Sequence, residues 1–216
     1  PYRRQRQMCI RDSHRAASAV RVSLKRREEH PDFTGQEEFN YFLSVLFADE
    51  ELMIMDYNRV LKELNGYQPE EILKKLEEVC KVEAVGENAY RPEKKGEMGF
   101  YMNGSWYRLS ARKERCQEDP VGALDVAFLQ REILEPFFGI QDPKTDGRID
   151  FVGGIRGLQE LERRCGADCI CAFSMYPTSI GELFDVADAD LLMPPKSTWF
   201  EPKLRSGLFI HKIERI

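Results

Sequence analysis

The dipeptide Asn103-Gly104 is the feature of this sequence that most constrains its fold. It stands between two runs rich in apolar residues, 98–102 and 106–109. Asn-Gly between such runs is the strongest short-range signal for a two-residue β-hairpin, because both turn residues must adopt positive φ. We therefore expect an antiparallel pair of strands in the middle of the chain.

The segments on either side of this hairpin alternate between predicted strands and helices. Further strands are expected at residues 38–47, 52–57, 81–85, 149–152, 169–173 and 208–213. Helices are expected at residues 14–29, 58–64, 68–79, 120–138, 155–164 and 179–187. A central antiparallel hairpin followed by strand–helix units near the C-terminal end predicts an α+β fold with a mixed sheet and some parallel pairing.

The first thirteen residues are best set aside from fold reasoning. Residues 3–13 match a one-frame translation of a common transposase sequencing adapter. Residues 1–13 are therefore interpreted as non-native, and residues 14–216 as the C-terminal part of a longer α+β protein. We expect that part to be inactive alone, and its first partner would be the missing N-terminal domain of its own chain.

Charge and cysteine usage narrow the class of protein. The full chain has net charge −5, and leaving out the four Arg and one Asp of residues 1–13 gives −8. An acidic chain is a poor general binder of nucleic acid, so DNA is an unlikely partner. The remaining cysteines number five, an odd count with irregular spacing, which favours reduced thiols in a cytoplasmic protein. No apolar run is long enough to predict a membrane span.

Residues 193–208 form a stiff, locally basic stretch. Three prolines fix φ and remove backbone donors, which excludes a helix, while Trp199 and Phe200 provide apolar anchors. The stretch also carries cations among hydroxyl side chains: Lys196, Lys203 and Arg205. Cations beside hydroxyls suit a phosphate or carboxylate ligand, and we expect them to share one cavity with Arg156. The alternative is a packed surface loop with solvated charges.

Residues 149–157 predict a second contact with an anion. A short strand leads into Gly153-Gly154 and then into a helix, so that backbone N–H groups can approach a phosphate. Arg156 would stand over that anion, and Asp146 or Asp150 would hold Mg²⁺. The alternative is a tight turn in which glycine is needed for positive φ.

His14-Arg15 opens the first predicted helix, where donor side chains beside free helix N–H groups make an anion site. From this point to the end, the chain resembles the family known as domain of unknown function ten-fifteen. The stretches that carry the resemblance are His14-Arg15, Glu38-Phe-Asn-Tyr-Phe42, Asp56-Tyr-Asn-Arg59, Asp119-Pro120, Leu124-Asp-Val126, Ile149-Asp-Phe-Val-Gly-Gly-Ile-Arg156, Ser174-Met-Tyr-Pro-Thr178 and residues 193–208.

The resemblance implies a function that composition alone does not. In that family a D-G-H-H-R motif starts the helix, and here only its last two residues, His14 and Arg15, are present. The motif is similar to the phosphate-binding box of the ParB/sulfiredoxin superfamily, which includes a free-serine kinase. It implies a nucleotide-dependent phosphotransferase that uses ATP or ADP with Mg²⁺ and acts on a small hydroxy amino acid such as serine.

Two other readings use the same residues. One is a non-catalytic sensor that binds a nucleotide or another small anionic metabolite. The other is a ParB-like DNA-partition factor, which the net charge of −8 and the lack of a helix-turn-helix signal disfavour. Under all three readings the catalytic residues stay unassigned, and the phosphate-binding candidates are His14, Arg15, Gly153, Gly154, Arg156, Lys196, Lys203 and Arg205.

Overall fold

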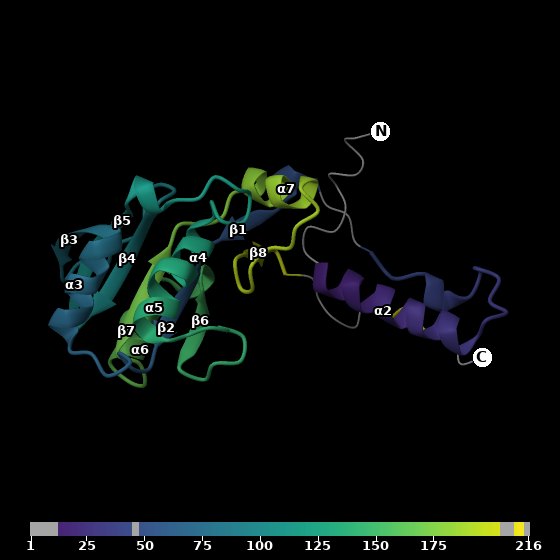
Figure 1. Ribbon diagram of the computed structural model, residues 1–216, viewed down its shortest axis with the longest axis horizontal. Coiled ribbons are helices and arrows are strands. Elements are labelled where there is room, and N and C mark those ends of the chain that lie inside the picture. The colour runs from purple at the N-terminus through teal and green to yellow at the C-terminus, as the bar shows by residue number, and fades with distance from the viewer. Residues whose placement is uncertain (1–12, 45–47, 204–209, 214–216) are drawn as a thin grey trace. The chain divides into compact units, whose positions relative to one another are not determined.

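The computed structural model describes residues 13–44, 48–203 and 210–213, with side chains from residue 16 onward. Two compact units divide the chain: unit 1 holds Pro1–Met53 with Phe200–Ile216, and unit 2 holds Ile54–Trp199 (Figure 1). The helical segments are α2 (Ser13–Glu29), η1 (Glu38–Asn40), η2 (Asp49–Glu51), α3 (Pro69–Val79), η3 (Lys113–Arg115), α4 (Asp125–Phe128), η4 (Leu129–Leu134), α5 (Glu135–Phe138), η5 (Gly154–Arg156), α6 (Gln159–Cys165) and α7 (Ile180–Asp188).

Unit 2 is built on a six-stranded antiparallel sheet in the order β3-β5-β4-β7-β2-β6. Its strands are β2 (Tyr57–Leu61), β3 (Cys80–Gly86), β4 (Glu97–Met102), β5 (Ser105–Ala111), β6 (Ile149–Gly153) and β7 (Cys171–Met175). The short strands β1 (Met53–Met55) and β8 (Trp199–Glu201) form a separate two-stranded sheet.

The predicted hairpin is confirmed as β4 and β5. Asn103 and Gly104 both have positive φ, 51° and 78°, as the two-residue turn requires. The α+β fold class is confirmed as well. The expected parallel neighbours are not: β6 and β7 are joined through α6, but each pairs antiparallel with β2, which lies between them.

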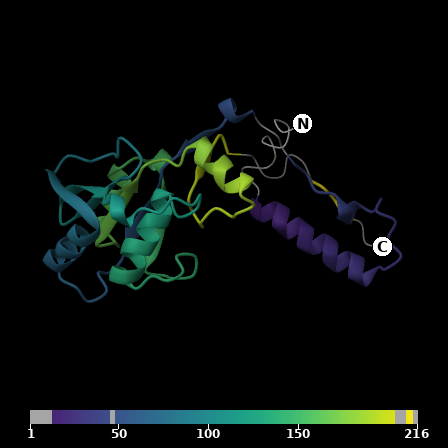
Figure 2. The same cartoon turned by 45° about the horizontal axis from the view of Figure 1, so that its top comes forward.

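Both faces of the sheet are covered by helices. One core packs α3 and the segment from α4 to α5 against the sheet, with the buried side chains of Phe100, Leu109 and Phe173 at its centre. In both views this helical segment crosses the sheet (Figure 1, Figure 2). The other core lies beneath α6, where Leu161 packs with Val60 of β2. The covered sheet gives the loops at its ends a rigid support.

Helix starts and ends follow local sequence signals. Gln68 caps α3 with Glu71 in a reciprocal capping box, and Ser179 does the same for α7 with Glu182. The predicted helix at residues 120–138 begins later, at Asp125, and its middle turn, η4, is π-helical. Such turns occur often at functional sites.

Three predicted elements are wrong within the described residues. Residues 58–64 form no helix, because 57–61 is the central strand β2, whose buried Asn58 and Arg59 resemble surface positions in sequence. Residues 38–44 hold only the 3-10 turn η1, since this apolar run has no neighbouring strand to complete a ladder; residues 45–47 lie outside the described part. Residues 210–213, the described part of the strand predicted at 208–213, form no strand.

Unit 1 contains α2 and η1. Asn40 of η1 accepts a hydrogen bond from the Nε of Arg27 at 2.9 Å, and the Arg27 guanidinium lies over the ring of Phe33. Phe39 is buried, whereas Tyr41, Phe42 and Leu43 remain exposed. None of the described helices is long and apolar enough to cross a bilayer.

Candidate functional site

A cavity of about 500 Å³ opens beside the central hairpin of unit 2. Its wall is formed by three lysines, two acids and several small or polar residues, so we call it the lysine cavity. The residues that line it are Lys94, Lys95, Gly96, Glu97, Ser110, Ala111, Lys113, Cys116, Gln117, Gly122, Ala123, Asp125 and Phe128. This volume is in the range of small-molecule and cofactor sites.

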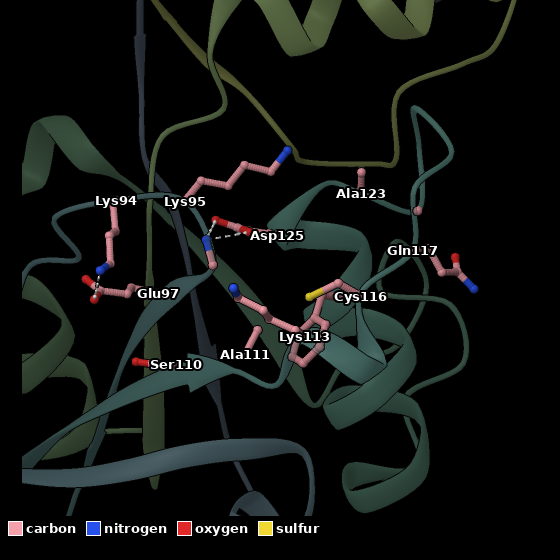
Figure 3. A pocket seen from close by; sticks show the side chains of 13 residues that line it. Lys94, Lys95, Glu97, Ser110, Ala111, Lys113, Cys116, Gln117, Ala123 and Asp125 are labelled. Carbon is pink, nitrogen blue, oxygen red and sulfur yellow. Dashed lines mark hydrogen bonds and ion pairs between the residues drawn. The ribbon is translucent and has the colours of Figure 1, made fainter.

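The cavity is assembled where three segments meet. The loop before β4 supplies Lys94 and Lys95, η3 after β5 supplies Lys113, and the start of α4 supplies Asp125. Figure 3 shows the Asp125 carboxylate between the side chains of Lys95 and Lys113. The hairpin therefore positions the cations, and the helix start positions the acid.

Asp125 is an acid of the cavity whose pKa lies well above its usual value. Both of its carboxylate oxygens accept a hydrogen bond from the backbone N of Gly96, each at 3.0 Å. Burial raises the pKa of Asp125 from 3.8 to about 6, while the Gly96 hydrogen bond acts in the opposite direction. A carboxyl group that titrates near neutral pH can accept and return a proton, which is what general acid–base catalysis requires.

The three lysines differ in their partners. Lys95 makes a 2.6 Å ion pair with Glu182 of α7, and Lys94 lies 3.7 Å from Glu97. Lys113 has no ion pair among the described residues. Because Lys113 is an exposed cation at the rim of a cavity, it is the residue best placed to contact an incoming anion.

Cys116 gives the cavity a chemical probe. Among the cysteines of the described residues it is the exposed one, and its Sγ donates to the Arg112 carbonyl at 3.5 Å. Burial raises the pKa of Cys80 and of Cys165 to about 12, so both are poor nucleophiles at neutral pH. A thiol reagent should therefore modify Cys116 first.

Several predicted phosphate-binding residues lie in unit 1. His14 and Arg15 stand in the first turn of α2, as expected, but their side chains lie outside the described part. The backbone N of Lys203 donates to Glu201 Oε2 at 3.2 Å, and Arg205 lies outside the described residues. Their role in anion binding stays a prediction.

Gly153 and Gly154 are needed for close packing. Neither has positive φ, and a Cβ at Gly153 would lie 2.4 Å from the Trp199 ring. A Cβ at Gly154 would lie 2.3 Å from Asp56 Oδ1, and the Gly154 N already donates to the Asp56 carbonyl at 2.8 Å. The positive-φ residue of this turn is Gly157, at 74°.

Arg156 does not line the lysine cavity; its Nη1 lies 3.6 Å from Glu160. Asp146 accepts hydrogen bonds from Arg148 at 2.6 Å, and Asp150 accepts one from Arg164 at 2.9 Å. The described residues contain no group of three or more His, Cys, Asp or Glu side chains that could hold a metal. The Mg²⁺ site at these two acids stays a prediction.

Lys196, a cation of the loop at residues 193–208, contacts the buried Arg59 through its backbone carbonyl. Its carbonyl accepts a 3.1 Å hydrogen bond from Arg59, and its ammonium lies 5.9 Å from the ring centres of Tyr57 and Phe151. Arg59 and Asp125 both fall inside stretches that carry the family resemblance, yet no local pattern marked either one as a site residue. Only the packing of the sheet shows that Asp125 lines the lysine cavity and that Arg59 is buried.

Fold and site together define an α+β protein with the lysine cavity beside its central hairpin. Residues 5–127 match the family described as Protein of unknown function (DUF1015). The chain belongs to this family. No curated protein matches it.

Two solved structures show low similarity, both mutants of a free serine kinase in complex with AMP. The first is 13% identical with a TM-score of 0.42, covering 73% of this chain and 58% of that one. The second is 13% identical with a TM-score of 0.38, covering 70% of this chain and 54% of that one. The chain thus spans less than three-fifths of the length of these kinase chains.

Proposed function

We propose that this chain is part of a nucleotide-dependent phosphotransferase acting on a small hydroxy amino acid such as serine, and that the lysine cavity holds the nucleotide phosphates. The observation that carries the proposal is the juxtaposition, in one cavity, of three lysines with a carboxylate that titrates near neutral pH. Phosphoryl transfer asks a protein mainly for positioning and for charge stabilisation, both of which such a set supplies.

The lysines would neutralise the phosphates of ATP or ADP. Lys113 is free to contact them directly, whereas Lys94 and Lys95 would exchange their ion pairs with Glu97 and Glu182 for phosphate oxygens. With Asp125 and Glu97 also in the wall, the net formal charge of the lining is small. Anion binding then rests on where the ammonium groups point, and is weaker at high ionic strength.

Asp125 would act as the general base. In its ionised form it accepts the proton of the substrate hydroxyl, whose oxygen forms a new P–O bond to the terminal phosphoryl group. The anhydride P–O bond breaks, and the shortened nucleotide leaves with the bonding electron pair. The substrate gains the phosphoryl group, and Asp125 later returns its proton to solvent.

Nucleotide binding is tested on this chain by calorimetric titration with ATP, ADP and AMP. We expect Lys113→Ala to weaken binding about fivefold, the effect of losing roughly 1 kcal/mol of charged contact. Lys74→Ala, an exposed lysine of α3 outside the cavity, is the matched control and should leave the affinity unchanged. Equal affinity in all three proteins would contradict the assignment of the cavity.

Thiol chemistry gives an independent readout of occupancy. In a Cys9→Ser background, a chromogenic disulfide reagent should modify Cys116 first, and saturating nucleotide should slow that modification. An unchanged rate at a nucleotide concentration that calorimetry shows to be saturating would place the ligand elsewhere in the protein.

Catalysis is tested on the full-length protein that contains this chain, by following phosphoserine formation from serine with ATP or ADP. Asp125→Asn should abolish turnover while nucleotide still binds. Binding without turnover in the unmodified protein would instead favour the sensor reading, because a sensor needs the same cations but no base. Salt-dependent DNA binding by the same protein would support the DNA-partition reading.

A further inference from the structure

A second cavity of unit 2, of about 340 Å³, surrounds the buried guanidinium of Arg59. We call it the Arg59 cavity. The residues that line it are Arg59, Val126, Gln130, Leu134, Gln141, Asp142, Pro143, Lys144, Phe151, Pro194 and Pro195. It shares no lining residue with the lysine cavity.

Arg59 is a buried cation without an acidic partner. Its residue is 4% exposed, and its hydrogen bonds go to two backbone carbonyls, those of Tyr57 and of Lys196. No carboxylate among the described residues forms an ion pair with it. Burial lowers the pKa of Arg59 to about 10, so it stays charged at neutral pH. A buried charge that lacks a counter-ion is costly, and an anion in the cavity would offset that cost.

Gln130 provides the second observation. It lies in the π-helical turn η4, and its Nε2 donates to the carbonyls of Ile140 and Gln141 at 2.7 and 3.4 Å. These two carbonyls fix the orientation of the amide, because the flipped form would face oxygen with oxygen. Its Oε1 is buried and has no hydrogen-bond partner. An unsatisfied buried acceptor calls for a donor group.

Several other residues of the wall are apolar. Phe151 lies 5.6 Å from the Arg59 guanidinium, and Val126 and Leu134 come from the helical segment above the sheet. Pro194 and Pro195 close one side; the loop that carries them is tied down where Thr178 Oγ1 donates to the Ser197 carbonyl at 3.3 Å. Apolar side chains combined with a small number of polar groups are typical of a small-molecule site.

One acid stands at the rim. Asp142 accepts hydrogen bonds from the Lys144 backbone N at 2.9 Å and from the Thr145 hydroxyl at 3.3 Å, which hold it in its own turn. Its negative charge would weaken the binding of an anion, and Lys144 beside it would act in the opposite sense. Neither is buried, so Arg59 and Gln130 dominate the choice of ligand.

We propose that the Arg59 cavity binds a small carboxylic acid that carries an N–H or O–H donor on the same molecule, such as a free α-amino or α-hydroxy acid. The carboxylate would meet the unused N–H groups of Arg59, which present a fork suited to it. The donor would meet Oε1 of Gln130. The inference rests on residues separate from the lysine cavity, and so it stands or falls independently of the proposed nucleotide site.

The test is calorimetric titration of this chain with four probes. L-serine carries both groups, propionate lacks the donor, serine amide lacks the carboxylate, and inorganic phosphate replaces the carboxylate by a different anion. We expect serine to bind more tightly than propionate and serine amide not to bind. Phosphate binding at least as tightly as serine would overturn the carboxylate assignment, and failure of serine to bind would overturn the proposal.

Variants assign the ligand to the cavity. Arg59→Met should weaken serine binding about 10- to 100-fold, as expected for a charge-assisted contact. Gln130→Met should reduce the advantage of serine over propionate, and Asp142→Asn should tighten binding of both. Arg163→Met, on the exposed face of α6, is the matched control. Melting curves without ligand establish that each variant folds, and unchanged serine affinity in a folded Arg59→Met protein would sink the idea.

Discussion

The backbone N of Gly96 donates to both carboxylate oxygens of Asp125, at 3.0 Å each. This contact joins the loop before β4 to the first residue of α4, and it is the only hydrogen bond that the described residues give to that carboxylate. A single donor does not compensate for burial, which is why the pKa of Asp125 is raised to about 6. The fold therefore holds an acid under a stability cost, a feature common at functional sites.

That cost gives a pH-dependent prediction. Since the folded pKa of Asp125 is about 6, above its usual 3.8, the native state binds this proton more tightly than the unfolded state. Protonated Asp125 is better tolerated in the folded state than ionised Asp125. The free energy of unfolding therefore falls as pH rises from about 4 to about 6. Asp125→Asn should thus raise the unfolding free energy by about 1–3 kcal/mol at pH 7.5 and leave it unchanged near pH 3.5.

Urea unfolding of both proteins across pH 3.5–8 measures this difference, with the slope m as a check on two-state behaviour. A difference that is constant with pH would show that the Asp125 carboxyl titrates normally.

Gly154→Ala should destabilise unit 2 although Gly154 lies at a strand end. Its Cβ would meet Asp56, which is buried and held by Asn58 Nδ2 at 2.6 Å and by Arg91 at 3.2 Å. The carboxylate has little room to move, so we expect a loss of about 1–3 kcal/mol. Gly147→Ala, where a Cβ would meet nothing within 4 Å, is the matched control. Equal melting temperatures for the two variants would be inconsistent with the close approach.

Replacing Arg59 and replacing Arg148 should have different effects on the free energy of unfolding. Arg148 binds Asp146, Glu63 and the carbonyl of Phe138. The hydrogen bonds of Arg59 go only to carbonyls, and among the described residues it has no ion pair. Arg148→Met should cost about 2 kcal/mol. Arg59→Met should change stability by less than about 1 kcal/mol or raise it, since an unpaired buried charge is removed. Chemical denaturation of both variants without added anions decides the comparison.

Local patterns predicted much of unit 2 because its elements carry their own signals. Asn103-Gly104 determined the hairpin, and the capping residues Gln68 and Ser179 marked two helix starts. The central strand β2 was missed because its sequence contains Asn58 and Arg59, polar residues whose burial depends on partners far along the chain, such as the Met175 N that donates to Asn58 Oδ1. Both cavities were missed for the same reason.

The run at residues 38–44 shows the opposite error. Its aromatic and aliphatic residues favour a strand in isolation, but strand formation requires a neighbouring ladder, and the described residues provide none there. Apolar content was therefore a poor guide in unit 1. A turn does follow β6 at Gly153 and Gly154, where a Cβ would meet Trp199 or Asp56. Phosphate binding by these glycines and by Arg156 stays a prediction.

Trp106 and Glu162 give the last prediction, which concerns how α6 is held on the sheet. Trp106 of β5 is fully buried, and its Nε1 donates to Glu162 Oε1 of α6 at 2.8 Å. Glu162→Leu would leave the indole N–H without an acceptor in an apolar core, at a cost of about 1–3 kcal/mol. Glu162→Gln keeps an acceptor oxygen at the same place and should lose less than half as much. Tryptophan fluorescence during urea unfolding reports both stabilities, and equal losses for the two variants would show that the helix is held by its apolar contacts alone.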